Sequence, residues 1–74
     1  MSIRLYDYSK LLGRMREKGY TQESLAYEAG ISPATLNAKL CNKSDFKQSD
    51  IKNICTILSI PYVEIPAYFF CAAT

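Results

Sequence analysis

Two short helix signals separated by a single glycine constrain this sequence more than any other feature. Thr21 precedes the first helical stretch, residues 22–29, and its hydroxyl is placed to accept the amide hydrogen of Ser24. Gly30 follows directly, and a glycine at that position ends a helix by adopting the left-handed conformation. The chain is therefore expected to turn sharply at Gly30.

A second helix is predicted immediately after this turn. Ser32 is a preferred residue before a helix, and Pro33 is a preferred first helical residue because its missing amide hydrogen would lack a partner there anyway. The predicted helix covers residues 33–41, with Leu36 and Leu40 one turn apart on its inner face. The two short helices are thus joined by a tight turn.

Small side chains mark the place where these two helices would cross. Ala26 and Ala29 allow a close approach at a steep angle. The shared core is expected to contain Leu25, Ile31 and Leu36. This geometry exposes the outer face of the second helix at a width that matches the major groove of B-DNA. We therefore predict a helix-turn-helix over residues 22–40.

A further helix is predicted before this unit. It starts at Asp7 or Ser9, either of which can cap it, reaches Lys18 and is ended by Gly19. Its apolar stripe consists of Tyr8, Leu11, Leu12 and Met15. Its basic residues, Lys10, Arg14, Arg16 and Lys18, are expected on a solvated face.

A fourth helix is predicted to begin at Ser49 or just before it, after the turn at residues 42–45. Its core positions are expected to be Ile51, Ile54, Cys55 and Leu58, with Ile57 as a further candidate. Pro61 then opens a short fifth element that Pro66 interrupts. The sequence thus predicts an all-α fold, with four to five helices forming a single domain over residues 1–74.

Charge is distributed unevenly along the 74 residues, although the formal net charge is only +2. All nine lysine and arginine residues lie between Arg4 and Lys52, whereas Glu64 is the one charged residue from Asn53 onward. This predicts a basic half and an apolar, aromatic C-terminal segment, residues 61–74, that packs or pairs. A chain this short buries a small core, so we expect it to fold alone or as a small oligomer.

The sequence predicts neither an enzyme nor a metal site, and no cofactor is expected. It has no histidine, and its three cysteines, Cys41, Cys55 and Cys71, form no CxxC pair. Cys55 is expected in the core, and no catalytic constellation is apparent. The charged N-terminal residues argue against a secretory signal, and no apolar stretch reaches the roughly 20 residues of a membrane helix. A cytoplasmic protein is therefore expected.

A family resemblance is carried by the segment TQESLAYEAGISPATLNAKLCNKS, which resembles the helix-turn-helix of the lambda-repressor and Cro-like family of bacterial and phage regulators. Small prophage Cro-like regulators of Gram-positive bacteria are similar over almost the whole chain, through DYSKLLGRMREKGYTQ, CNKSDF and LSIPYVEIPAYFF. The resemblance implies a five-helix, lambda-repressor-like fold. It also implies a transcription regulator that binds double-stranded operator DNA, commonly as a homodimer, with the helix of residues 33–41 in the major groove.

The resemblance further implies roles for individual residues. Gln22 is expected to contact a DNA phosphate, and the N-terminus of a helix also favours binding of such an anion. The positions that face the bases are Pro33, Ala34, Asn37 and Ala38. The same DNA-binding surface is expected to include Ser32, with Thr35 and Lys39 as flanking contacts. The loop that clasps the DNA backbone corresponds to Asn42, Lys43 and Ser44.

The base-facing positions depart from better-known members of that family, which carry polar residues where this chain has Pro33, Ala34 and Ala38. Asn37 could bridge an adenine, but one good bidentate pair contributes only about 1 to 3 kcal/mol of discrimination. Specificity would then rest largely on phosphate contacts, DNA shape or a second subunit. A second function therefore stays open, that of a protein-binding module which modulates a partner repressor and contacts DNA weakly.

Four aromatic residues near the C-terminus allow two interpretations. They are Tyr62, Tyr68, Phe69 and Phe70. They either cover the core of the domain or form an interface with a second copy or another protein. The interface has support because clustered aromatic residues with almost no charge are unusual on the surface of a monomer.

Overall fold

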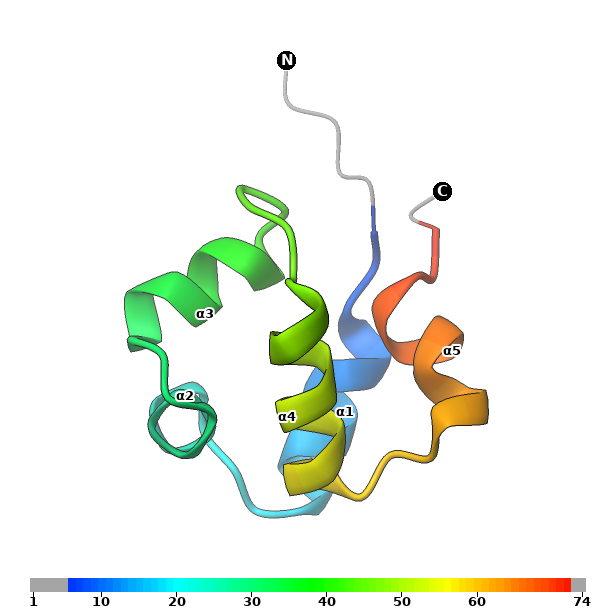
Figure 1. Ribbon diagram of the computed structural model, residues 1–74, viewed down its shortest axis with the longest axis horizontal. Helices are drawn as coiled ribbons and strands as arrows, with labels where there is room; N and C mark the ends of the chain where they lie inside the picture. Colours follow the sequence, from blue (N-terminus) through cyan, green and yellow to red (C-terminus); the bar gives the residue numbers. More distant parts are fainter. Residues whose placement is uncertain (1–5, 73–74) are drawn as a thin grey trace.

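The computed structural model describes residues 6–72, which form five α-helices and one short 3-10 helix (Figure 1). The elements are α1 (Ser9–Glu17), α2 (Gln22–Ala29), α3 (Pro33–Leu40), α4 (Gln48–Leu58), η1 (Tyr62–Glu64) and α5 (Ile65–Phe69). The predicted all-α fold is confirmed, and α3 ends one residue before the predicted Cys41. Extended pairing within the described part is limited to one isolated antiparallel bridge, between Tyr6 and Ala72.

Helix α4 runs through the middle of the molecule, with α2 and α3 on one side of it and α5 on the other (Figure 1). Helix α2 packs against both α3 and α4, and α5 packs against α1. The largest fully buried side chains are Leu11, Leu25, Leu36, Ile54, Leu58 and Phe69. Each helix thus contributes to one core. Of the predicted core positions, four are only partly buried: Leu12, Ile31, Ile51 and Ile57.

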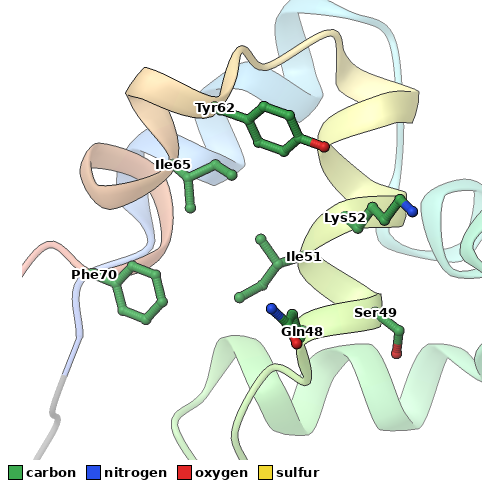
Figure 2. A pocket seen from close by; sticks show the side chains of 7 residues that line it. All are labelled: Gln48, Ser49, Ile51, Lys52, Tyr62, Ile65 and Phe70. Atoms are coloured by element: carbon green, nitrogen blue, oxygen red, sulfur yellow. The ribbon is translucent and has the colours of Figure 1, made fainter.

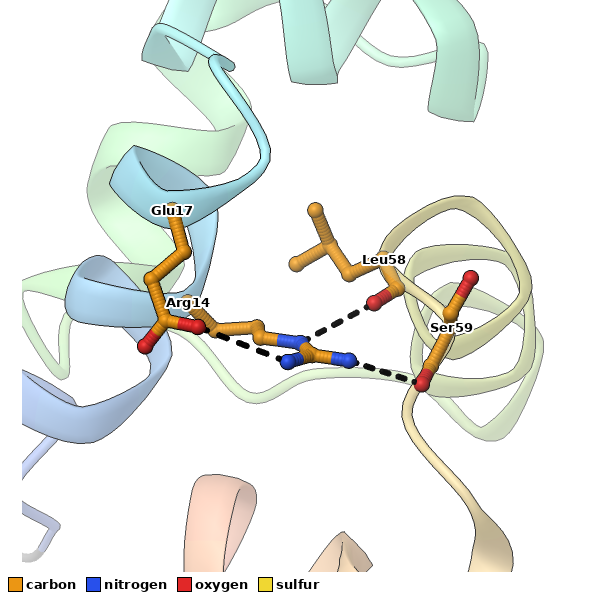
Figure 3. Close-up of polar contacts among 4 residues, drawn as sticks. All are labelled: Arg14, Glu17, Leu58 and Ser59. Carbon is orange, nitrogen blue, oxygen red and sulfur yellow. Dashed lines mark hydrogen bonds and ion pairs between the residues drawn. The ribbon is translucent and has the colours of Figure 1, made fainter.

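Arg14 crosses from α1 to the C-terminal end of α4 (Figure 3). Its Nε donates a hydrogen bond to the carbonyl of Leu58 at 3.1 Å, and its Nη2 donates one to the carbonyl of Ser59 at 3.0 Å. These carbonyls lie where a helix has no amide partners left and where its dipole favours a cation. The expected solvated position is therefore wrong for Arg14, which caps α4, whereas Arg16 and Lys18 are exposed.

Both ends of the described chain are fixed at the turn that follows α3. The amide of Asp7 donates to the carbonyl of Cys71 at 2.8 Å. The side-chain amide of Asn42 brackets Tyr6, accepting from its N–H and donating to its carbonyl, both at 3.0 Å. Asn42 itself has a φ of 62°, a left-handed conformation that asparagine tolerates well. This residue therefore joins the turn to the N-terminal segment.

The C-terminal aromatic residues divide between the core and the surface. Tyr68 and Phe69 are 7% and 1% exposed, whereas Tyr62 and Phe70 are 76% and 52% exposed. The expected interruption at Pro66 is wrong, because this residue lies in the first turn of α5, where a missing amide hydrogen costs nothing. Tyr68 and Phe69 thus cover the core, as the first interpretation expects, and the interface interpretation stays a prediction for Tyr62 and Phe70. Residues 73–74 lie outside the described part.

An ion pair inside the protein links α3 to α4. The Lys39 ammonium lies 2.8 Å from the Asp50 carboxylate and donates to the carbonyl of Asp45 at 2.9 Å. Lys39 and Asp50 are 5% and 8% exposed. Burial raises the pKa of Asp50, but hydrogen bonds from the Lys39 ammonium and the Lys47 amide outweigh it and hold that pKa below its ordinary value. The Asp50 carboxyl is therefore ionised at neutral pH.

Asp50→Asn is expected to lower the free energy of unfolding by about 3 to 5 kcal/mol at pH 7, because Lys39 would stay buried without its partner. The folded-state pKa of Asp50 is depressed, so its contribution is present above the unfolded-state pKa of about 4 and is lost as the pH falls through the folded value. Urea unfolding between pH 7 and pH 2 measures both effects. The difference in the free energy of unfolding between the wild type and Asp50→Asn should shrink as the pH is lowered.

Asp45→Asn is the matched control, because that side chain is exposed and its carbonyl is kept. If Asp50→Asn fails to fold, the double variant Lys39→Met/Asp50→Leu, which removes both charges, should restore folding. A wild-type unfolding curve for Asp50→Asn at pH 7 would contradict the role of the pair.

The aromatic segment yields a second prediction. Phe69→Ala should lower the free energy of unfolding by about 3 to 5 kcal/mol, because it empties a fully buried site. Tyr62→Ala should change it by no more than about 0.5 kcal/mol, because that ring is 76% exposed. Urea unfolding of the two variants measures the contrast, and equal losses would show that the segment packs differently.

Candidate functional site

The predicted helix-turn-helix begins with a reciprocal cap at the start of α2. The Thr21 hydroxyl accepts a hydrogen bond from the amide of Ser24 at 3.1 Å, and the Ser24 hydroxyl accepts one from the amide of Thr21 at 2.9 Å. This confirms the predicted cap and extends it to a capping box. Two amides at this helix start are thus already satisfied by the protein itself.

The turn between α2 and α3 has the conformation that the sequence predicts. Gly30 has a φ of 77°, and the next amide, that of Ile31, donates to the carbonyl of Ala26 at 3.0 Å. The Ser32 hydroxyl then accepts the amide hydrogen of Thr35 at 3.1 Å and caps α3. These local hydrogen bonds fix how α3 is presented to solvent.

Most of the predicted DNA-contacting residues lie together on the outer face of α3 and the start of α2. Ser32, Pro33, Ala34, Thr35 and Asn37 are exposed, whereas Ala38 and Gln22 are partly buried. The Asn37 amide donates to the Gln22 side-chain carbonyl at 3.2 Å, so these two residues are joined across the two helices. Lys43 and Ser44 are exposed in the loop after α3.

Two predicted contacts are placed differently, and both expectations need correction. Lys39 does not face outward, because its ammonium is buried against Asp50. Asn42 is partly buried, and its side-chain amide is engaged on both sides by the backbone of Tyr6. Neither residue offers a free polar group to a phosphate in this arrangement.

The exposed helix-turn-helix surface therefore has little positive charge. Between Thr21 and Ala38 the charged side chains are Glu23 and Glu28, both exposed. DNA affinity depends largely on lysine and arginine side chains that neutralise phosphates. From Thr21 to Ala38 the chain thus carries two exposed carboxylates and no cation, and the exposed lysines on either side in sequence are Lys18 and Lys43.

A second candidate surface is an apolar groove between α4 and the C-terminal helices (Figure 2). We call it the α4–α5 groove, and it is lined by Gln48, Ser49, Ile51, Lys52, Tyr62, Ile65 and Phe70. Its volume is about 650 Å³. In Figure 2, Ile51 on α4 faces Ile65 and Phe70 across the groove.

Of the residues that line this groove, the sequence indicated Tyr62 and Phe70 as candidate interface residues, without predicting a groove. It placed Ile51 in the core and did not indicate Ile65. Val63, next to Tyr62, is 87% exposed and was not among the predicted interface residues. A signal for Val63 and Ile65 was available, because both lie in the nearly uncharged stretch after Asn53. The partial exposure of Ile51 depends on how α5 packs, which no local pattern reveals.

The three cysteines differ in their surroundings. Cys55 is buried, as predicted, and burial raises the pKa of its thiol, whereas Cys41 and Cys71 are exposed. Within residues 6–72, no group of three or more His, Cys, Asp or Glu side chains is arranged to hold a metal ion. No helix in the same range is long and apolar enough to cross a membrane.

Comparisons with known proteins place the chain in a family. A family model described as Protein of unknown function (DUF739) matches residues 4–72. No protein with a curated description matches. Among solved structures, a similar one is the solution structure of the modulator of repression (MOR) of the temperate bacteriophage TP901-1 from Lactococcus lactis. It is 40% identical, with a TM-score of 0.77 and a match covering 88% of each chain. Because the family model spans nearly all of the sequence, the chain belongs to the DUF739 family.

Proposed function

We propose that this chain is a phage regulatory protein that binds a partner repressor and modulates it, with only weak contact to DNA. The observation that carries the proposal is the exposed α4–α5 groove, in a chain 40% identical to a modulator of repression. The name of that relative describes action on repression. A protein that acts in this way needs a surface for another protein.

The α4–α5 groove has the composition of a protein interface. Tyr62 and Phe70 place exposed aromatic rings beside Ile51 and Ile65. Aromatic side chains next to apolar hollows carry much of the binding energy in protein interfaces, while charged residues are depleted from their centres. The single charged residue that lines the groove is Lys52. An apolar side chain or helix face of the repressor is the occupant that fits this composition.

DNA binding remains a second candidate because one feature of the site favours it. The Gln22–Asn37 hydrogen bond joins two exposed or partly exposed amides at the positions where the Cro-like resemblance expects phosphate and base contacts. Against it stand the two carboxylates of the helix-turn-helix and the burial of Lys39. The charge around this pair therefore supports weak DNA contact rather than tight operator binding.

The first test is a calorimetric titration of the purified chain with the repressor encoded in the same genome. Tyr62→Ser and Phe70→Ser should each weaken binding at least tenfold, because each removes an exposed aromatic ring from the groove. Asn53→Ser is the control and should bind like the wild type, because Asn53 is exposed on α4 and does not line the groove.

Three outcomes would contradict the proposal. The first is wild-type affinity in both groove variants, and the second is that the repressor does not bind at all. The third is that the chain alone forms a dimer in light scattering and Phe70→Ser abolishes that dimer, which would make a second copy the occupant of the groove.

A second test addresses DNA directly. In titrations with a random duplex pool at two salt concentrations, we expect an affinity no tighter than non-specific binding, roughly 10⁻⁴ to 10⁻⁶ M, and a shallow salt dependence. Asn37→Ala should then leave the affinity unchanged. Tight, sequence-selective binding that Asn37→Ala weakens would instead favour an operator-reading regulator.

A further inference from the structure

A second exposed surface lies along α2. Tyr27 is 86% exposed and stands beside an open hollow of about 720 Å³. Ile31 and Pro33 form apolar parts of the lining of the same hollow, and Glu23 and Glu28 also line it. We call these five residues the α2 patch. An exposed ring next to an apolar hollow is a typical feature of a binding surface.

The α2 patch is acidic without any compensating charge. No lysine or arginine occurs from Thr21 to Ala38, and among the residues that the structure describes neither Glu23 nor Glu28 takes part in an ion pair. The nearby Glu28 carboxylate raises the pKa of the Tyr20 hydroxyl.

The chemistry of this arrangement selects one kind of partner. A guanidinium group stacks on the face of a tyrosine ring and forms paired hydrogen bonds with carboxylates. Tyr27 lies one helical turn after Glu23, which places these two residues on one side of α2, and Glu28 lines the same hollow. Nucleic acid is disfavoured, because its phosphates would meet two negative charges and no cation.

We propose that the α2 patch binds an arginine-bearing segment of a protein partner, with the guanidinium stacked on Tyr27 between Glu23 and Glu28. The patch shares no lining residue with the α4–α5 groove. Helix α2 also lies on the opposite side of α4 from α5 (Figure 1). The two surfaces can therefore be occupied at the same time, and each can exist without the other.

The test follows the amide signals of the full-length, ¹⁵N-labelled chain during titration with a hexa-arginine peptide blocked at both ends. Saturable shifts are expected at the amides of α2. Glu23→Gln/Glu28→Gln should weaken binding at least tenfold, and Tyr27→Ala at least threefold. Blocked hexa-lysine should bind more weakly than hexa-arginine, because an ammonium group cannot stack or pair in two places.

Matched controls separate this site from general attraction between charges. Glu17→Gln/Glu64→Gln changes the net charge equally at exposed positions outside the patch and should stay within twofold of the wild type. Tyr62→Ala removes an exposed ring from the α4–α5 groove and should bind the hexa-arginine peptide like the wild type. The peptide titration therefore tests the α2 patch separately from the repressor proposal, which depends on the groove.

Three results would overturn the inference. The first is an equal loss of affinity in the two double variants. The second is a set of shifts confined to residues outside the α2 patch. The third is duplex DNA shifting the same amides with a higher affinity than the peptide.

Discussion

The Lys39–Asp50 pair joins the two helices that the rest of the molecule depends on. Lys39 comes from the exposed helix of the helix-turn-helix, and Asp50 lies in the first turn of the central helix α4. The same carboxylate also accepts the amide hydrogen of Lys47 at 3.0 Å and so starts α4. One acidic side chain therefore caps a helix and holds its neighbour, in a domain whose core is too small to tolerate many losses.

The pair also affects the outer surface of α3. A lysine late in a recognition helix is a natural partner for a DNA backbone, but here it is directed inward and its charge is neutralised. What α3 presents instead is Pro33, Ala34, Thr35 and Asn37, none of them charged. A buried ion pair adds little net stability compared with an apolar pair of similar size. Its main consequence here is the position of the lysine, which removes a cation from the surface that would face DNA.

Local signals predicted the helix-turn-helix well because its structure is determined locally. The Thr21–Ser24 cap, the left-handed Gly30 and the Ser32–Pro33 start each depend on residues within three positions of one another. They gave the bounds of α2 and the start of α3.

Side-chain direction was harder to predict, because it depends on contacts far apart in the sequence. Arg14 reaches carbonyls 44 and 45 residues away, and Asn42 brackets a residue 36 positions before it. The residues near Arg14 and Asn42 in the sequence do not indicate these distant partners. The local pattern also did not show which aromatic residues of the C-terminal segment are buried, because the burial of Tyr68 and Phe69 depends on contacts with the rest of the fold. The predicted interruption at Pro66 was wrong because α5 begins at the residue before it, so the proline lies in the first turn of the helix.

The absence of an exposed lysine or arginine from Thr21 to Leu40 can be explained by the separation of shape from charge. Crossing angle and turn geometry come from caps, a glycine and small core residues, whereas affinity for DNA comes from lysine and arginine side chains that these features do not require. Surface charge can therefore change while the scaffold keeps its stability. Glu23 and Glu28 line the same hollow as Tyr27, and this negative charge is what the proposed cationic partner would complement. Under the two proposals, the groove beside α5 and the outer side of α2 are the surfaces on which binding energy would be gained.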